Sequence, residues 1–279
     1  MPDILLHLMP LIAASLLYAV LGYHFWHTRW RSTHFTEAAL PMQAWERQAI
    51  CFALVLHGAG LYEGLFSTGG MRFSVSFALS LMLWIAALIY WLESFRSRMD
   101  GLQALVLPLA ALCAPLPALL PQAHLIAHTN AWGFRLHFLA AMLAYSLFTL
   151  SALHAVFMGI VERKLHHGKL NRQLASLPPL LAMEALLFRM ISVGFVLLTL
   201  TLGSGLMFSD QLFGKAFVFD HKTLFAFTSW GIFAALLVGR KVYGWRGRSA
   251  LRWTLAGFLV LFLAYIGSRF VSEVLLGRI

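Results

Sequence analysis

Charged side chains are scarce in this chain of 279 residues, since Asp, Glu, Lys and Arg together make up 11% of it. An ordinary soluble domain contains about 25% charged residues. Hydrophobic residues reach 60%, and the mean hydropathy is +0.77. The composition therefore excludes a typical soluble domain and predicts a chain that lies mostly in lipid.

Cysteine is almost absent: only Cys51 and Cys113 occur, both in apolar stretches, with no CxxC and no CxxCH motif. These absences exclude a dithiol oxidoreductase and a c-type cytochrome. We expect both thiols to be buried and inert. The chain also lacks a nucleophile elbow, a phosphate-binding loop and paired carboxylates, so we do not expect an enzyme.

Apolar stretches of about 20 residues, long enough to cross about 30 Å of hydrocarbon, occupy nearly the whole chain. They predict an all-α, polytopic membrane protein with eight transmembrane helices in a single membrane domain. The first stretch lacks a basic leader and is too long for a signal peptide core, so we expect a retained helix. The predicted spans are 4–26, 47–66, 72–93, 102–121, 132–160, 184–208, 221–240 and 251–274.

Two spans depart from a plain helix. The fourth contains Pro108, Pro115, Pro117 and Pro121, which predict a kink and a non-helical outer end. The fifth is longer than a membrane requires, and we expect it to continue as a helix through residues 161–164 into the cytoplasm.

The number of Lys and Arg residues alternates from loop to loop. The loops on one predicted side contain fourteen in total, and those on the other side contain five. This bias predicts that both termini lie outside, in the periplasm if the membrane is a bacterial inner membrane. It also explains the net charge of +10 better than a nucleic acid partner does, because the basic residues do not gather on one face.

Six of the twelve histidines lie toward the predicted outer side. His57 is nine residues before Phe66 at the end of its span, hence about 13 Å deep. His137 is five residues inside the span that starts at Trp132, about 7 Å deep. His221 opens the seventh span. By contrast, His154 lies in the inner part of its span, where we expect a structural hydrogen bond.

Haem chemistry suits these histidines better than zinc binding or proton transfer. Zinc prefers closely spaced ligands; only His124 and His128, in a short outer loop, resemble such spacing. A proton relay needs acidic neighbours, and Glu63 faces away from His57. Haem needs two axial ligands, an apolar slot and cations for its propionates. We therefore predict His57 and His137 as axial ligands of a non-covalent b-type haem.

His221 is the alternate ligand in this hypothesis. The candidate propionate partners are Lys222, Arg135, Arg72 and Arg269, and we predict no metal site. The structural alternative stays open: each histidine is also explained by packing or hydrogen bonding, and His221 by the membrane interface. Arg269 has another possible partner in Glu273, four residues further on.

Several segments resemble the cytochrome c assembly family. They are the helix from His137 through Tyr145 and Ser146, and Asp220-His221-Lys222 followed by Trp230. Further segments are similar to the YpjD-like inner-membrane branch of that family, which is also linked to the name CorE. They are residues 56–58, 177–180 with Glu184, 194–201, 244–248 and 264–270.

The resemblance implies haem export or presentation at the outer face, with His137 matching an external ligand histidine and His57 an intramembrane one. Three features depart from the family pattern. The tryptophan-rich haem-presenting segment is replaced by the short loop 122–131, Val238 stands where a second intramembrane histidine is expected, and no histidine follows Tyr265. Complete cytochrome c synthase activity is therefore not expected.

Three hypotheses follow. The first is a haem-binding protein of the bacterial inner (plasma) membrane, multi-pass, with the lipid bilayer, haem and other cytochrome biogenesis proteins as partners and no nucleic acid. The second, suggested by the name CorE, is a cation transport or efflux-linked protein acting through Glu63, Asp210, Asp220 or His221. The third is a non-catalytic regulatory subunit of a haem-pathway enzyme.

Overall fold

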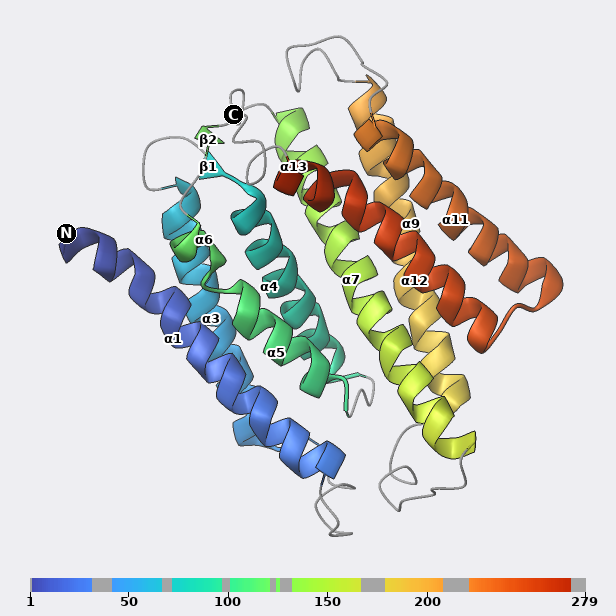
Figure 1. The fold of residues 1–279 in the computed structure, drawn as a ribbon, viewed down its shortest axis with the longest axis horizontal. Coiled ribbons are helices and arrows are strands. Elements are labelled where there is room, and N and C mark those ends of the chain that lie inside the picture. Colours follow the sequence, from blue (N-terminus) through green and yellow to red (C-terminus); the bar gives the residue numbers. More distant parts are fainter. Residues whose placement is uncertain are drawn as a thin grey trace.

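The computed structural model describes residues 2–31, 42–66, 72–96, 101–120, 124–125, 132–166, 179–207 and 221–271. These residues form long helices and one pair of two-residue strands (Figure 1). Seven helices among them are long and apolar enough to cross a membrane. The prediction of a helical, multi-pass membrane protein is therefore confirmed.

The elements follow the predicted spans closely. In the first half they are α1 (Pro2–Phe25), η1 (Trp26–Arg31), α3 (Ala44–Phe66), β1 (Arg72–Phe73), α4 (Val75–Glu93), α5 (Gln103–Cys113), α6 (Leu116–Leu119) and β2 (His124–Leu125). In the second half they are α7 (Trp132–His166), α9 (Leu180–Met207), α11 (His221–Tyr243), α12 (Arg248–Phe262), η2 (Leu263–Gly267) and α13 (Ser268–Phe270).

The fourth predicted span is the exception to a count of eight full-length spans. Its apolar segment, Gln103–Leu119, is shorter than the other seven, and α5 and α6 are separated by a turn at Ala114 and Pro115. The predicted break in the second half of this span is therefore confirmed.

Neighbouring hydroxyl groups satisfy the carbonyls that this break releases. Pro115 has no N–H to donate to Ala111 O, and Ser15 Oγ of α1 donates to that carbonyl instead, at 2.7 Å. Ala118 N donates to Pro115 O, and Ser80 Oγ of α4 donates to Ala114 O at 3.4 Å. The break thus fixes α5 against both α1 and α4.

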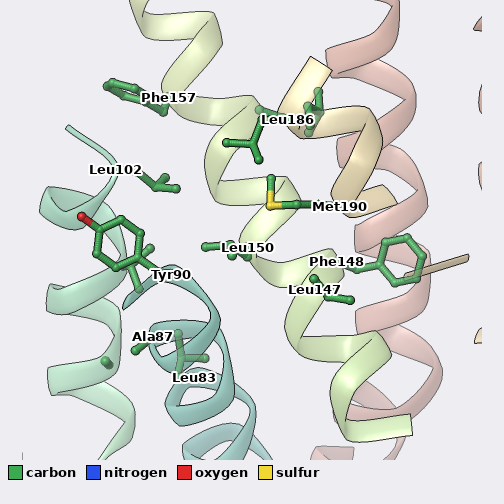
Figure 2. Close-up of a cluster of buried hydrophobic side chains, with 14 of the residues drawn as sticks. Leu83, Ala87, Tyr90, Leu102, Leu147, Phe148, Leu150, Phe157, Leu186 and Met190 are labelled. Carbon is green, nitrogen blue, oxygen red and sulfur yellow. The ribbon is translucent and has the colours of Figure 1, made fainter. Parts of the chain in front are cut away.

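Helix α7 lies between two groups of helices (Figure 1). On one side α4 packs against it, with α1, α3 and α5 beyond; on the other side lie α9, α11 and α12. Figure 2 shows the core that joins them: Leu83, Ala87 and Tyr90 lie on α4, while Leu147 and Leu150 lie on α7. All five are buried.

The start of the third predicted span differs from the sequence prediction. Residues Arg72 and Phe73, expected to begin a helix, form β1 and pair antiparallel with β2. The buried Phe73 also meets Phe138 of α7 edge-on, with ring centroids 5.1 Å apart. The long fifth helix is confirmed, because α7 continues to His166. The part of the last predicted span beyond residue 271 lies outside the described residues.

A buried carboxylate links the start of α3 to the end of α1. Glu46 is 2% exposed and occupies the third position of α3, where its Oε2 accepts a hydrogen bond from Gln43 N at 2.7 Å. This is half of a capping box. His24 Nε2 bonds to Oε1 at 2.9 Å, and Arg29 Nη2 donates to Oε2 at 3.3 Å. The cluster closes the end of the helix pair.

Candidate haem site at the end of α7 and α9

His137 lies on the second turn of α7 and faces the end of α9. Its ring is half-buried, and its Nδ1 lies 2.9 Å from Ser204 Oγ. A β-carbon at Gly205 would stand 3.6 Å from Cε1 of the imidazole, so the glycine leaves room beside the ring. The two helices therefore hold the imidazole in a defined direction.

The hydrogen bonds around Ser204 favour one tautomer of this imidazole. Ser204 Oγ lies 3.1 Å from Thr201 O, to which it can only donate. When it does so, its oxygen accepts from Nδ1–H of His137, and the lone pair is on Nε2. A histidine oriented through Nδ1–H, with Nε2 as the donor atom, is the usual arrangement of an iron or zinc ligand.

The other predicted ligand groups that can be placed lie at the same end of the bundle. His221 is exposed at the first residue of α11, with the half-buried Lys222 beside it, and Arg135 is exposed on the first turn of α7. The side chains of Arg72 and Arg269 lie outside the described residues. Lys222 and Arg135 are therefore the two predicted cations that the structure places at this end.

An aromatic pair joins α9 to α11 deeper in the bundle. Phe195 stacks on Trp230 with ring centroids 5.5 Å apart, and Trp230 Nε1 donates to Thr199 Oγ1 at 2.9 Å. Phe195 lies nine residues before Ser204, which places it on the opposite face of α9 and about 13 Å further along it. Sequence reasoning missed this pair and Ser204, because their contacts join distant parts of the chain.

His57 occupies a different environment, fully buried between α1, α3 and α4. Its Nε2 lies 2.8 Å from Ser80 Oγ, and Tyr18 meets its ring edge-on at 5.7 Å between centroids. Ser80 Oγ also lies 3.4 Å from Ala114 O, and when it donates to that carbonyl, His57 donates from Nε2–H and its lone pair is on Nδ1. That Nδ1 is buried and has no hydrogen-bond partner in the described structure.

The structure does not bring His57 and His137 together. Helix α4 lies between α3 and α7 (Figure 1), and each imidazole is bonded to a serine of a different neighbouring helix. A single porphyrin held axially by both has no support in this arrangement. The sequence supplied the depth of each histidine but not the neighbour that it faces.

The remaining polar predictions have mixed outcomes. The structural hydrogen bond of His154 is confirmed, since Nε2 donates to Met183 O at 3.0 Å. Cys51 and Cys113 are free, but only partly buried. Glu63 is exposed, and the described residues contain no group of three His, Cys, Asp or Glu side chains able to hold a metal ion. Asp210 and Asp220 lie outside the described residues, as do His128 and the side chain of His124.

Comparison with known proteins identifies the family. The family description "Cytochrome C assembly protein" matches residues 45–276, which is most of the chain. The chain belongs to the cytochrome c assembly family. Both imidazoles, His57 and His137, lie within the matched region.

Individual relatives agree with this assignment. The inner membrane protein YpjD of Escherichia coli K12 is 30% identical over 239 residues, covering 83% of this chain and 89% of the relative. A 28.8 kDa protein of Azospirillum brasilense is 31% identical over 142 residues, 51% of this chain and 52% of its own. The cytochrome c biogenesis protein CcsA of Prochlorococcus marinus is 39% identical over 90 residues, 32% of this chain and 29% of its own.

Proposed function

We propose that this protein is a haem-handling member of its family in the bacterial inner membrane, which binds haem non-covalently where α7 meets α9. The observation that supports the proposal most directly is the hydrogen-bond series His137–Ser204–Thr201, which leaves Nε2 of a half-buried imidazole as a donor atom. Haem, when bound, supplies an iron that accepts such a nitrogen.

The neighbouring residues support the same ligand class. Lys222 and Arg135 supply cations for propionates, and His221 is the alternate histidine at this end. We place this end in the periplasm, because the loops at the opposite end contain most of the Lys and Arg. Both termini are then periplasmic.

We do not propose thioether formation by this chain. The loop that replaces the tryptophan-rich segment is short, and among the described residues at this site only the histidines were predicted to have a chemical role. His57, enclosed by Tyr18, Ser80 and α4, belongs to a separate intramembrane site. In this packing its Nε2 is bonded to Ser80, so Nδ1 is the nitrogen left for a ligand. A role that presents or retains haem for other assembly proteins fits these residues best.

The first experiment is an absorption spectrum of protein purified in detergent from haem-replete cells. Wild-type protein is expected to show a Soret band, and His137→Ala is expected to weaken haem binding at least tenfold, because the axial nitrogen is lost. His27→Ala removes an exposed histidine of η1, at the end of the bundle away from His137, and should leave the spectrum unchanged. A wild-type protein without a Soret band, or an unaltered band in His137→Ala, would refute the proposal.

A second prediction concerns the positioning serine. Ser204→Ala removes the acceptor of His137 Nδ1–H while leaving the imidazole in place, and we expect about a tenfold loss of haem affinity with a shifted reduction potential. Ser151→Ala is the matched control, because Ser151 Oγ bonds only to Leu147 O of its own helix. Equal effects of the two serine variants would show that Ser204 is only structural.

A further inference from the structure

A groove of about 550 Å³ opens between α9 and α11 at the end of the bundle opposite to His137. Three cationic side chains line it: Arg189 from α9, and Arg240 and Lys241 from α11. Its apolar wall includes Phe188 and Leu237. A basic rim and an apolar wall therefore share one cavity.

The cations of this groove exceed the carboxylates beside it. Arg240 Nη1 and Arg246 Nε both donate to Glu184 Oε1, at 2.9 and 3.1 Å, and Arg189 pairs with Glu93. Lys241 is exposed at the rim. Among the described groups that line the groove or pair with its lining, there are four cations and two carboxylates. Counted over these groups, two positive charges are in excess.

Arg240 is held in place before any ligand arrives. Its guanidinium lies 3.7 Å from the centroid of the Phe188 ring, in addition to its bond to Glu184. A guanidinium has five N–H donors, so this pairing leaves others for a second oxyanion. Its fixed plane lowers the entropy cost of binding a phosphate.

The apolar wall extends from this rim into the membrane. Leu237 lies four residues before Lys241 on α11, hence about 6 Å further into the bilayer. The surrounding surface of α9 and α11 is apolar and exposed, as at Val193, Val196 and Val238. An occupant of the groove therefore meets cations at one end and hydrocarbon at the other.

We propose that this groove binds one anionic phospholipid, with its phosphate on Lys241 and Arg240 and an acyl chain along Phe188 and Leu237. Basic pockets between transmembrane helices are suited to acidic headgroups. A zwitterionic lipid adds a cation of its own, which the two excess positive charges disfavour. In the orientation proposed above, the site lies in the cytoplasmic leaflet. The inference is independent of haem binding.

The test uses the delipidated full-length protein in detergent and native mass spectrometry, with phosphatidylglycerol and phosphatidylcholine as probes. We expect one retained phosphatidylglycerol per chain, held about tenfold more tightly than phosphatidylcholine. Lys241→Gln should weaken phosphatidylglycerol about fivefold, as expected for one charge near a membrane surface, and Lys241→Arg should restore it. Arg252→Gln, an exposed charge on α12 outside the groove lining, is the matched control.

A second variant tests the apolar half without changing charge. Leu237→Trp fills the groove and should remove the retained lipid while the protein stays monodisperse. Equal retention of the two lipids would overturn the proposal, as would retention of inorganic phosphate alone in place of phosphatidylglycerol. The proposal is also wrong if Arg252→Gln weakens binding as much as Lys241→Gln does. It is equally wrong if lipid is lost only when a dimer of the chain dissociates, because the lipid would then lie between two copies.

Discussion

Replacing Glu46 by leucine is expected to lower the free energy of unfolding by about 3–5 kcal/mol. The substitution removes a buried carboxylate that accepts bonds from His24, Arg29 and Gln43 N. The side chain of Arg29 is 5% exposed, so its charge would lose its carboxylate in a poorly solvated position. Breaking one side of a buried ion pair costs far more than the net contribution of the intact pair.

Unfolding by denaturing detergent in mixed micelles measures this effect. Glu93→Gln is the matched control, because Glu93 pairs with Arg189, whose side chain is 55% exposed. Such an accessible pair contributes about 0–1 kcal/mol. If Glu46→Leu unfolds at the same denaturant fraction as Glu93→Gln, the buried cluster does not close the helix pair in the way described.

Phe148→Ala is expected to cost about 3–5 kcal/mol. The Phe148 ring is fully buried, stacks on Phe233 at 4.0 Å between centroids, and would meet a β-carbon at Gly194 at 3.2 Å. Lipid tails are as apolar as the helix interior, so transfer from water contributes little between these helices. The loss comes from the cavity and its missing van der Waals contacts.

The same unfolding assay measures this second effect. Phe52→Ala removes an identical side chain that is 60% exposed on α3, and its expected change is within about 0.5 kcal/mol. Similar losses for both phenylalanine variants would mean that the stacked contact between α7 and α11 adds no specific stability. Figure 2 shows Phe148 on α7 within this core.

The spans were predictable because hydropathy and length are local properties of a sequence in lipid. Proline chemistry also predicted the break in the fourth span, since Pro115 and Pro117 have no N–H. The strand pair at Arg72 and Phe73 was missed, because its partner β2 lies about fifty residues away and neither segment has a strand pattern by itself. Local sequence signals do not show such long-range pairing.

The site was only partly predictable for a related reason. The positions of His57 and His137 along their helices were predictable, since they follow from the rise per residue. The direction of either ring relative to its neighbours was not predictable, because it depends on how α4 packs between α3 and α7. Ser204 is 67 residues from His137 along the chain, so its hydrogen bond appears only in the fold.

The basic loops were read from the sequence as topology signals alone. That reading explains their number, but Arg189 and Arg240 have specific partners in Glu93 and Glu184 that alternating loop charge does not predict. Only when these ion pairs are known is it evident that the positive charge of Lys241 exceeds the charge of the neighbouring carboxylates. A charge count therefore predicted orientation, whereas the geometry was needed to predict a ligand.

The interrupted segment α5–α6 has a consequence for the surrounding bilayer. Its apolar part, Gln103–Leu119, has 17 residues and a helical length of about 25 Å. This is several ångströms less than a typical hydrocarbon thickness. Leu112 and Leu119 are exposed on this segment, so acyl chains contact it directly. A span shorter than the hydrocarbon layer is accommodated by local thinning of the bilayer or by snorkelling of its flanking residues, so we expect acyl-chain length to matter most on this flank.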